Sequence, residues 1–557
     1  MKRQTIVLGS FWLIFLFINL RLFYWQVIKS STLAQAAADQ YYYTLHLTPQ
    51  RGNIETNDGA VLVTNKMAYL VYAEPPKIKN KNDFSHAVSE LLTLEEEVVA
   101  TRIASTSAMW VPLKRKVDEA TRKKVEDLDL SGIGFEKTGT RFYPESSMAA
   151  HLLGFVGSDA QGQDYGYFGL EGHYQRALAG RDGLLMQEKD ARGLPILLGS
   201  AKRISAENGQ NLKLHLDRTV QFIAENKLKE GITRYGAKAG LVAIIEPKTG
   251  GILGAAAFPN YDPMKYGEVD NSLYANPLIA QTYEPGSTFK ALIMAAALNE
   301  HVITPQTTFN EEGPVNIGQY FIRTWNNEYH GEMTMSEVLE KSSNPGMVFV
   351  AGKLGNEKLI KYIEDFGFGK KTGIDLEEEE TSPLRPAGSW KEIDLATASF
   401  GQGIAVTPIQ MLRAISVLAN NGKLIEPHIV DQIIDPVGKT ISVKPKVLKQ
   451  VIRPATAKII TEMMISAVDK GEAKWAKPAG YRIAGKTGTA QIPVSGHYDS
   501  EKTIAAFVGF APADDPKFAM LVLLREPTTS PWGSETAAPL FFNIAKELFT
   551  YYGISPN

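Results

Sequence analysis

The sequence has 557 residues, of which 44% are hydrophobic and 22% charged, a composition typical of folded globular proteins and a length too great for one core. The formal net charge of -2 gives no electrostatic basis for binding nucleic acid. The sequence contains no cysteine, which excludes disulfides, thiolate metal sites and cysteine catalysis.

The N-terminal segment is apolar and follows two positive charges. Lys2 and Arg3 precede an uncharged run over 6–18, and the apolar pattern continues to Trp25. A cleaved signal peptide would carry small residues close behind the apolar run, but the alanines begin only at 34. Residues 1–28 are therefore predicted to form an uncleaved transmembrane anchor, with the N-terminus in the cytoplasm and the bulk of the chain outside.

The next region, 29–205, has mixed character. An alanine-rich helix is expected over 31–43, and the Asp58-Gly59 pair predicts a hairpin. Helical periodicity runs over 83–127 with a break near Trp110. We expect an elongated α/β module here, without an obvious catalytic set.

Strand-like sequence occurs at both ends of the last region, 206–557, and helical sequence lies between. Hairpins are predicted over 240–257 and 503–524, and an amphipathic helix over 535–552. This order favours an α+β domain in which one antiparallel sheet is closed by both chain ends around an inserted helical lobe. The acidic run 377–380 is interpreted as a solvated loop.

Ser287 and Lys290 form a candidate pair of nucleophile and base. Pro285 and Gly286 mark a turn, and the apolar run after it predicts a helix that begins near Ser287. Residues three apart share a helical face, so Lys290 can lie beside Ser287. A serine hydroxyl needs a neighbour to take its proton, and lysine can do so only when burial or a second cation lowers its pKa. The alternative without catalysis is that Ser287 only caps the helix and Lys290 is an ordinary surface lysine.

Two short motifs could complete this pair. Ser342 could pass a proton to a leaving group and Asn344 could hold a substrate amide, while Lys486 could supply the second cation. The residues after Lys486 could bind substrate. The hydroxyls of Thr487 and Thr489 could bind a carboxylate, and Gly488 could let a peptide lie against the strand edge. Backbone amides of Ser287 and Thr489 could form an oxyanion hole.

Each motif has competitors elsewhere in the chain. Lys-Thr-Gly also starts at 137, 248 and 371, but only the copy at 486 borders the predicted sheet of the domain that contains Ser287. A second Ser-x-Asn occupies 555–557, where chain ends fray. Residues 480–487 match the phosphate-binding P-loop, yet this motif needs a strand before it and a helix after it, and the flanks here are reversed.

With Ser-x-x-Lys, Ser-x-Asn and Lys-Thr-Gly in this order, the chain resembles a class B penicillin-binding protein, a monofunctional transpeptidase. Further stretches extend the resemblance over nearly the whole chain: Arg51-Gly52-Asn53-Ile54, Arg141-Phe142-Tyr143-Pro144, His151-Leu152-Leu153-Gly154, Gly169-Leu170-Glu171-Gly172, Thr372-Gly373-Ile374-Asp375-Leu376 and Ser399-Phe400-Gly401-Gln402-Gly403. The sequence around Ser287 is more similar to the division branch of the family than to the elongation branch.

The resemblance implies a pedestal module over 29–205 and a penicillin-binding transpeptidase domain over 206–557, with a five-stranded sheet. It implies a single-pass protein of the bacterial inner membrane that cross-links peptidoglycan stem peptides, releases D-Ala and is acylated by β-lactams at Ser287. A SEDS-family glycosyltransferase and other membrane proteins of division or elongation are the expected partners, and no cofactor or metal is expected. The alternatives are an elongation-specific transpeptidase, a β-lactam sensor or scaffold without turnover, and a DD-carboxypeptidase.

Overall fold

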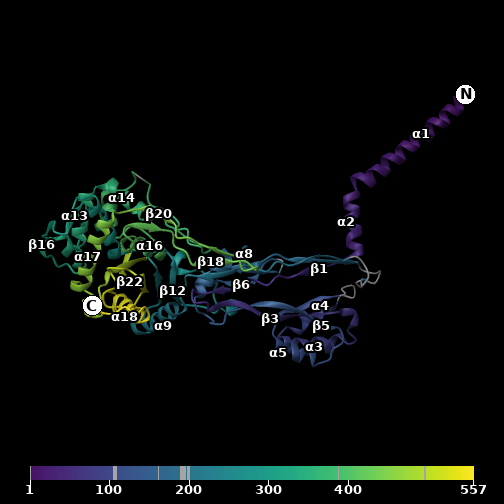
Figure 1. Cartoon of the computed structure of the whole chain (residues 1–557), viewed down its shortest axis with the longest axis horizontal. Coiled ribbons are helices and arrows are strands. Elements are labelled where there is room, and N and C mark those ends of the chain that lie inside the picture. The colour runs from purple at the N-terminus through teal and green to yellow at the C-terminus, as the bar shows by residue number, and fades with distance from the viewer. Residues whose placement is uncertain are drawn as a thin grey trace. The chain divides into compact units, whose positions relative to one another are not determined.

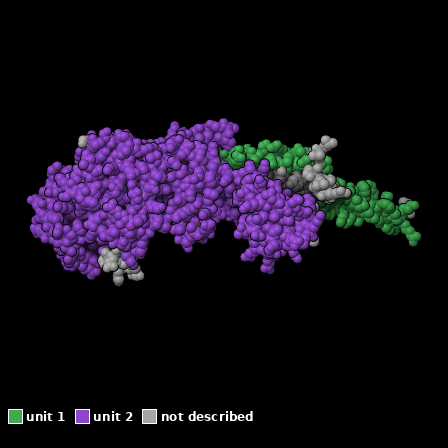
Figure 2. All heavy atoms as spheres, turned by 90° about the horizontal axis from the view of Figure 1, so that it is seen from below, with its two compact units in different colours: residues 1–51, 179–209 green, residues 52–178, 210–557 purple. Residues whose placement is uncertain are grey.

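The computed structural model describes residues 2–104, 110–160, 162–188, 196, 201–386, 388–494 and 497–556. The chain forms two compact units, of which one combines 1–51 with 179–209 and the other combines 52–178 with 210–557 (Figure 2). The second unit contains most of the chain and every predicted site residue.

The first unit begins with a long apolar helix. Helix α1 spans Lys2–Phe23 and continues as a π-helical turn over Tyr24–Ile28 (Figure 1). Its most apolar window has a mean hydropathy of 2.1, and none of that window is buried. These 27 residues rise about 40 Å, enough to cross the apolar core of a bilayer. The unit also contains α2 and an antiparallel sheet of three strands: α2 Ser30–Tyr41, β1 Tyr42–Leu47, β8 Gly183–Glu188 and β9 Ala201–Ile204.

A seven-stranded sheet joins strands that are far apart in the sequence. Its path is β19-β18-β10-β2-β3-β4, with β5 also paired to β3. The Asp58-Gly59 pair makes the predicted hairpin between β2 and β3, because Gly59 has a φ of +85° that suits glycine. The strand bounds are β2 Ile54–Glu55, β3 Val61–Ala73, β4 Val111–Val117, β5 Ile133–Phe142, β10 Asn211–Leu214, β18 Val430–Ile434 and β19 Thr440–Ser442.

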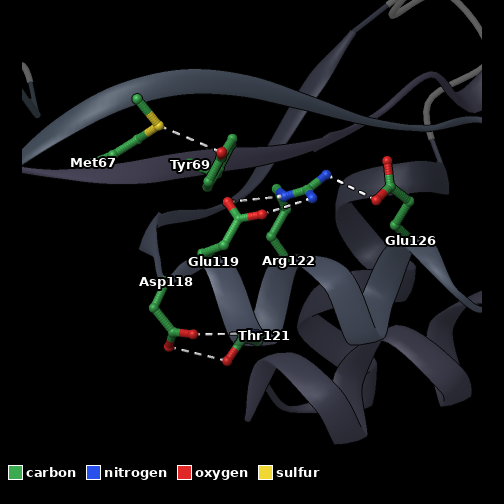
Figure 3. A network of polar contacts seen from close by, with 7 residues as sticks. All are labelled: Met67, Tyr69, Asp118, Glu119, Thr121, Arg122 and Glu126. Atoms are coloured by element: carbon green, nitrogen blue, oxygen red, sulfur yellow. Dashed lines mark hydrogen bonds and ion pairs between the residues drawn. The ribbon is translucent and has the colours of Figure 1, made fainter.

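One end of this sheet carries three helices, α3 Lys81–Leu92, α4 Glu96–Ala104 and α5 Glu119–Glu126, over a small apolar core. Arg122 of α5 binds Glu119 and Glu126 at 2.9 Å each, and its guanidinium lies 5.0 Å from the ring of Tyr69 on β3 (Figure 3). The predicted helical pattern over 83–127, with its break near Trp110, is wrong over 111–117, because that segment pairs with β3 as strand β4. Local periodicity could not reveal this distant partner.

A buried ion pair links two of the stretches that carry the family resemblance. Arg141 on β5 donates to Glu171 at 2.6 Å, and the two side chains are 4% and 0% exposed. The elements that follow β5 are short: α6 Ala150–Leu153, β6 Phe155–Ser158, β7 Asp164–Tyr167, α7 Gly169–His173 and α8 Gln175–Ala179.

The C-terminal region forms the predicted antiparallel sheet, with five strands in the order β12-β11-β23-β22-β21. Helices α9 and α18 pack on one face through an aromatic-rich core, and α16 packs on the other (Figure 1). The buried residues of α11 belong to the same core cluster as those of α16. Both predicted hairpins and the C-terminal helix are confirmed. The bounds are β11 Ala239–Ile245, β12 Ile252–Phe258, β21 Ala484–Val494, β22 His497–Ala511, β23 Phe518–Arg525, α9 Arg218–Tyr235, α11 Lys290–Asn299, α16 Pro408–Ala419 and α18 Ala537–Tyr551.

The segment between the two hairpins is mainly helical, as predicted, and includes three small strand pairs. Its helices are α10 Pro277–Ala280, α12 Met335–Glu340, α13 Asn344–Leu354, α14 Asn356–Asp365, α15 Glu392–Ala398 and α17 Pro454–Lys470. Its strands are β13 Thr308–Glu311 with β16 Gly331–Thr334, β14 Val315–Ile317 with β15 Tyr320–Ile322, and β17 Lys423–Ile425 with β20 Val447–Gln450.

The acidic run 377–380 is only partly the solvated loop that we predicted, since Glu378 and Glu380 are exposed but Glu379 is not. Glu379 is 6% exposed and accepts hydrogen bonds from the backbone and hydroxyl of Thr372 at 2.5 Å. Glu377 accepts from the backbone of Phe168 at 2.8 Å. These carboxylates satisfy backbone N–H groups that would otherwise be buried without partners, a need that the charge pattern alone does not show.

Candidate active site

Ser287 lies in a tight turn at the head of α11. The turn is a 3-10 segment over Gly286–Phe289, as the helix-start prediction required, and Ser287 is half-buried. Gly286 has a φ of +54° and donates to the carbonyl of Gly401 at 3.0 Å. Two further backbone bonds of 2.9 Å join Tyr283 and Val406, so the stretch 401–406 holds the serine turn in place.

Lys290, the first residue of α11, is completely buried. Its Nζ lies 2.6 Å from the carbonyl oxygen of Ser342, 3.2 Å from the Ser342 hydroxyl and 2.7 Å from Oδ1 of Asn344. Among the described residues, its hydrogen bonds go to these two residues and not to Ser287. Burial, and then the charge of Lys486, hold the pKa of Lys290 well below its usual value, while Glu472 and Glu311 act in the opposite direction.

These contacts suit a neutral amine. A neutral lysine donates two hydrogen bonds and keeps one lone pair, which matches two oxygen acceptors and one hydroxyl that can itself donate. Lys290 can therefore donate to the carbonyl oxygen of Ser342 and to Asn344, and accept from the Ser342 hydroxyl. The result is a neutral base whose lone pair faces a second proton carrier, the Ser342 hydroxyl.

The turn between α12 and α13 presents Ser342 and Asn344. Ser342 has a φ of +55°, which is rare for serine and directs both its carbonyl and its hydroxyl to Lys290. Ser343 caps α13 by accepting from the backbone of Gly346 at 2.8 Å, and its hydroxyl donates to Glu311. Sequence reasoning missed Glu311, which is 1% exposed on β13, because nothing local marks it as a partner of this turn.

Lys486 to Thr489 lie on β21, an edge strand of the five-stranded sheet. Lys486 is 4% exposed and donates to the carbonyl and hydroxyl oxygens of Thr487 at 3.2 Å each. Burial lowers the pKa of Lys486 to about 8, against the opposing charge of Glu472. Lys486 is thus mainly a cation at neutral pH. Thr487 and Thr489 are half-buried and alternate along the strand with buried Gly488.

Gly488 brings this strand against the serine turn. A Cβ at position 488 would lie 2.7 Å from the methyl carbon of Thr288 and 3.3 Å from the carbonyl oxygen of Pro285. The sequence suggested that this glycine makes room for a peptide, but the close neighbour in the structure is the chain around Ser287. The glycine therefore sets the distance between the Lys-Thr-Gly strand and the nucleophile.

An aromatic contact that the sequence did not predict lies near both motifs. The rings of Trp325 and Trp532 meet edge to face at 4.9 Å. Asn344 donates to the carbonyl of Arg323 at 2.9 Å, and the backbone of Gly533 donates to the hydroxyl of Thr489 at 2.9 Å. Each tryptophan is therefore next in the chain, or nearly so, to a residue that is hydrogen-bonded to a predicted site residue.

The competing motifs lie elsewhere. The Lys-Thr-Gly copies at 137, 248 and 371 fall on β5, in the turn between β11 and β12, and in a loop after α14. The P-loop match has β21 after it where a phosphate site needs a helix. The last residue of the Ser-x-Asn at 555–557, Asn557, lies outside the described residues.

Comparison with known proteins agrees with the fold and the order of the motifs. The Penicillin binding protein transpeptidase domain model matches residues 240–546, and the Penicillin-binding Protein dimerisation domain model matches 46–214. Stage V sporulation protein D of Bacillus subtilis is 37% identical over 562 residues, covering 100% of this chain and 86% of that protein. The probable peptidoglycan D,D-transpeptidase PenA of Neisseria meningitidis is 29% identical, covering 100% of this chain and 93% of that one.

A solved structure has the same fold. Penicillin Binding Protein 2X from Streptococcus thermophilus superposes with a TM-score of 0.75 at 24% identity, covering 91% of this chain and 80% of that chain. The dimerisation and transpeptidase models together match most of the sequence. The chain therefore belongs to the penicillin-binding proteins, and within them to class B.

Proposed function

We propose that this protein is a membrane-anchored DD-transpeptidase that cross-links peptidoglycan, with Ser287 as the nucleophile. The observation that carries the proposal is the buried amine of Lys290, which lies between Ser342 and Asn344 one turn after Ser287 and has a pKa well below its usual value. A serine nucleophile needs a neighbouring base, and Lys290 can serve as that base at neutral pH because burial and the charge of Lys486 lower its pKa.

The acylation step follows from these positions. Neutral Lys290 takes the proton of Ser287 as the hydroxyl oxygen attacks the penultimate carbonyl of a stem peptide that ends in D-Ala-D-Ala. The developing oxyanion is bound by the backbone N–H groups of Ser287 and Thr489. The proton then passes through the Ser342 hydroxyl to the amine of the leaving D-Ala. An acyl-enzyme and free D-Ala remain.

Substrate is held beside the serine by β21. Thr487 and Thr489 hydrogen-bond the terminal carboxylate, and the Lys486 cation adds electrostatic attraction. Asn344 holds an amide of the stem peptide, and Gly488 keeps the strand close to the serine turn. An amine of a neighbouring stem then attacks the carbonyl of the acyl-enzyme and gives a proton to Lys290. As the new amide forms, the ester bond to Ser287 breaks, and Lys290 returns the proton to the Ser287 hydroxyl oxygen. A β-lactam carries the same carboxylate and acyl carbonyl and acylates the same serine.

The place of this reaction in the cell is part of the proposal. The apolar helix over residues 1–28 anchors the protein in the bacterial inner membrane, with the N-terminus in the cytoplasm. Residues 29–205 serve as a pedestal and 206–557 as the transpeptidase domain. We place it in septal wall synthesis beside a SEDS-family glycosyltransferase. The relatives support a wall-building role, since they include proteins named for sporulation and for D,D-transpeptidase activity.

The test uses the full-length protein in detergent with a fluorescent penicillin. Wild type is expected to be labelled covalently, Ser287→Ala is expected to remain unlabelled, and the control variant Ser336→Ala on α12 is expected to label normally. Labelling of the Ser287 variant would refute the assignment of the nucleophile. Cross-linked dimers formed on lipid-linked glycan with a partner polymerase would support transpeptidation. Release of D-Ala without dimers would instead identify a carboxypeptidase, and acylation with neither product would identify a sensor.

A further inference from the structure

A cavity of about 260 Å³ lies at the end of the five-stranded sheet where β11 begins and β23 ends. Its described lining does not include Ser287, Lys290 or the Lys-Thr-Gly strand. Much of its wall is apolar, contributed by Leu241, Phe258, Pro408, Ile504 and Leu523. An apolar cavity of about 150 Å³ admits a benzene ring, so this one has room for a two-ring aromatic molecule.

His151 supplies a buried hydrogen-bond acceptor in the wall. It is 7% exposed, and its Nε2 lies 3.0 Å from the carbonyl oxygen of Leu273. A carbonyl can only accept, so Nε2 carries the proton and Nδ1 presents a lone pair, which no donor among the described residues reaches. Burial lowers the pKa of His151 to about 4, which keeps the ring neutral.

Arg525 supplies positive charge in the same wall and is more exposed. Its side chain is 46% exposed, so it lies toward the mouth, while His151 lies deep. The carboxylate of Glu526 is 3.8 Å from the guanidinium, but Lys238 binds that carboxylate at 2.5 Å. The mouth therefore has positive charge in excess, and an anionic group of a ligand would meet it there.

We infer that this cavity binds a small aromatic carboxylic acid whose ring system carries an N–H or O–H donor. The ring fills the apolar volume and its donor reaches Nδ1 of His151. The carboxylate pairs with Arg525 at the mouth. A single rigid molecule of this kind contacts both Nδ1 of His151 and the guanidinium of Arg525. Because it is rigid, it loses little conformational entropy on binding.

The position of the cavity connects it to the nucleophile. Tyr283 and Pro408 both line it. Tyr283 exchanges two backbone hydrogen bonds of 2.9 Å with Val406, and it begins the turn that ends at Ser287 four residues later. A ligand packed against Tyr283 and Pro408 changes the conformational freedom of the turn that carries Ser287. We therefore expect occupancy of the cavity to alter the rate of acylation at least about twofold.

The test measures binding of indole-3-acetate to the full-length protein in detergent by isothermal titration. Penicillin is first used to acylate Ser287, because a free active site could also attract a carboxylate. Saturable binding to the acylated protein is expected, with about tenfold or greater loss for Arg525→Ala, recovery in Arg525→Lys, and no loss for the control Arg234→Ala on α9. The analogue 1-methylindole-3-acetate, which lacks the ring donor, tests the contact with His151 without changing the protein.

Absence of saturable binding, loss of binding on acylation, or equal affinity for the methylated analogue would each overturn the inference. The effect on acylation is measured with fluorescent penicillin in the presence of indole-3-acetate, and an unchanged rate at saturation would refute the connection to Ser287. Covalent labelling of Ser287 is scored independently, so failure of the cavity site leaves the proposed function standing.

Discussion

Replacing Gly488 by alanine tests the contact between the Lys-Thr-Gly strand and the serine turn. The new Cβ would lie 2.7 Å from the methyl carbon of Thr288, about 1 Å closer than carbon atoms normally approach. Overpacking of this kind costs about 1–3 kcal/mol and is relieved when one side moves. A shift of about 1 Å at a catalytic group can cost about a hundredfold in rate. We therefore expect acylation by penicillin to fall by about that factor.

The assay is the second-order rate constant of acylation, measured with a fluorescent penicillin, together with the melting temperature. Gly139→Ala is a matched control, since Gly139 also lies in a strand and its added Cβ would meet no atom within 4 Å. Adding Thr288→Ser to Gly488→Ala removes the clashing methyl group and keeps the hydroxyl that donates to Pro285 at 2.6 Å, so the double variant should recover part of the rate. If Gly488→Ala is acylated as fast as wild type, or if the double variant recovers none of the lost rate, this reasoning is refuted.

Three further outcomes are expected. Burial and then the charge of Lys486 lower the pKa of Lys290, so Lys486→Met should move the rise of acylation rate to higher pH, whereas Lys474→Met should leave it in place. Arg141→Met removes the cation that is ion-paired with buried Glu171 and should cost about 3–5 kcal/mol, seen as a lower melting temperature; an unchanged melting temperature would contradict this. The pKa of His151 is lowered from 6.5 to about 4, so the unfolded chain binds the proton first and stability falls as pH drops from 6.5 to 4, by about 3 kcal/mol; a His151→Asn variant with the same pH slope would count against it.

The transpeptidase sheet and the head of α11 could be predicted because their signals are local. Turn residues mark the hairpins over 240–257 and 503–524, and Pro285-Gly286 marks the start of the helical segment. Each signal lies within a few residues of the structure that it specifies. These elements also bring the Lys-Thr-Gly strand against the turn that carries Ser287.

Other features depend on partners far away in the sequence. Strand β4 forms because β3 offers it a pairing edge, and the acidic run 377–380 is held by backbone groups of Phe168 and Thr372. Glu311 meets Ser343 across 32 residues. A sequence pattern within ten or twenty residues cannot indicate such contacts, because they form only when distant parts of the chain pack together.

The seven-stranded sheet also has a consequence for how the chain folds. Strand β2 pairs with β10 about 158 residues later, and β10 then pairs with β18 more than 200 residues beyond it. During synthesis, the hairpin of β2 and β3 must wait with an open edge until β10 has emerged, and β10 must then wait for β18. Closing such long loops makes folding slow and leaves that edge exposed to other chains. Assembly of this sheet is therefore expected to be the stage at which newly made protein most needs protection from aggregation.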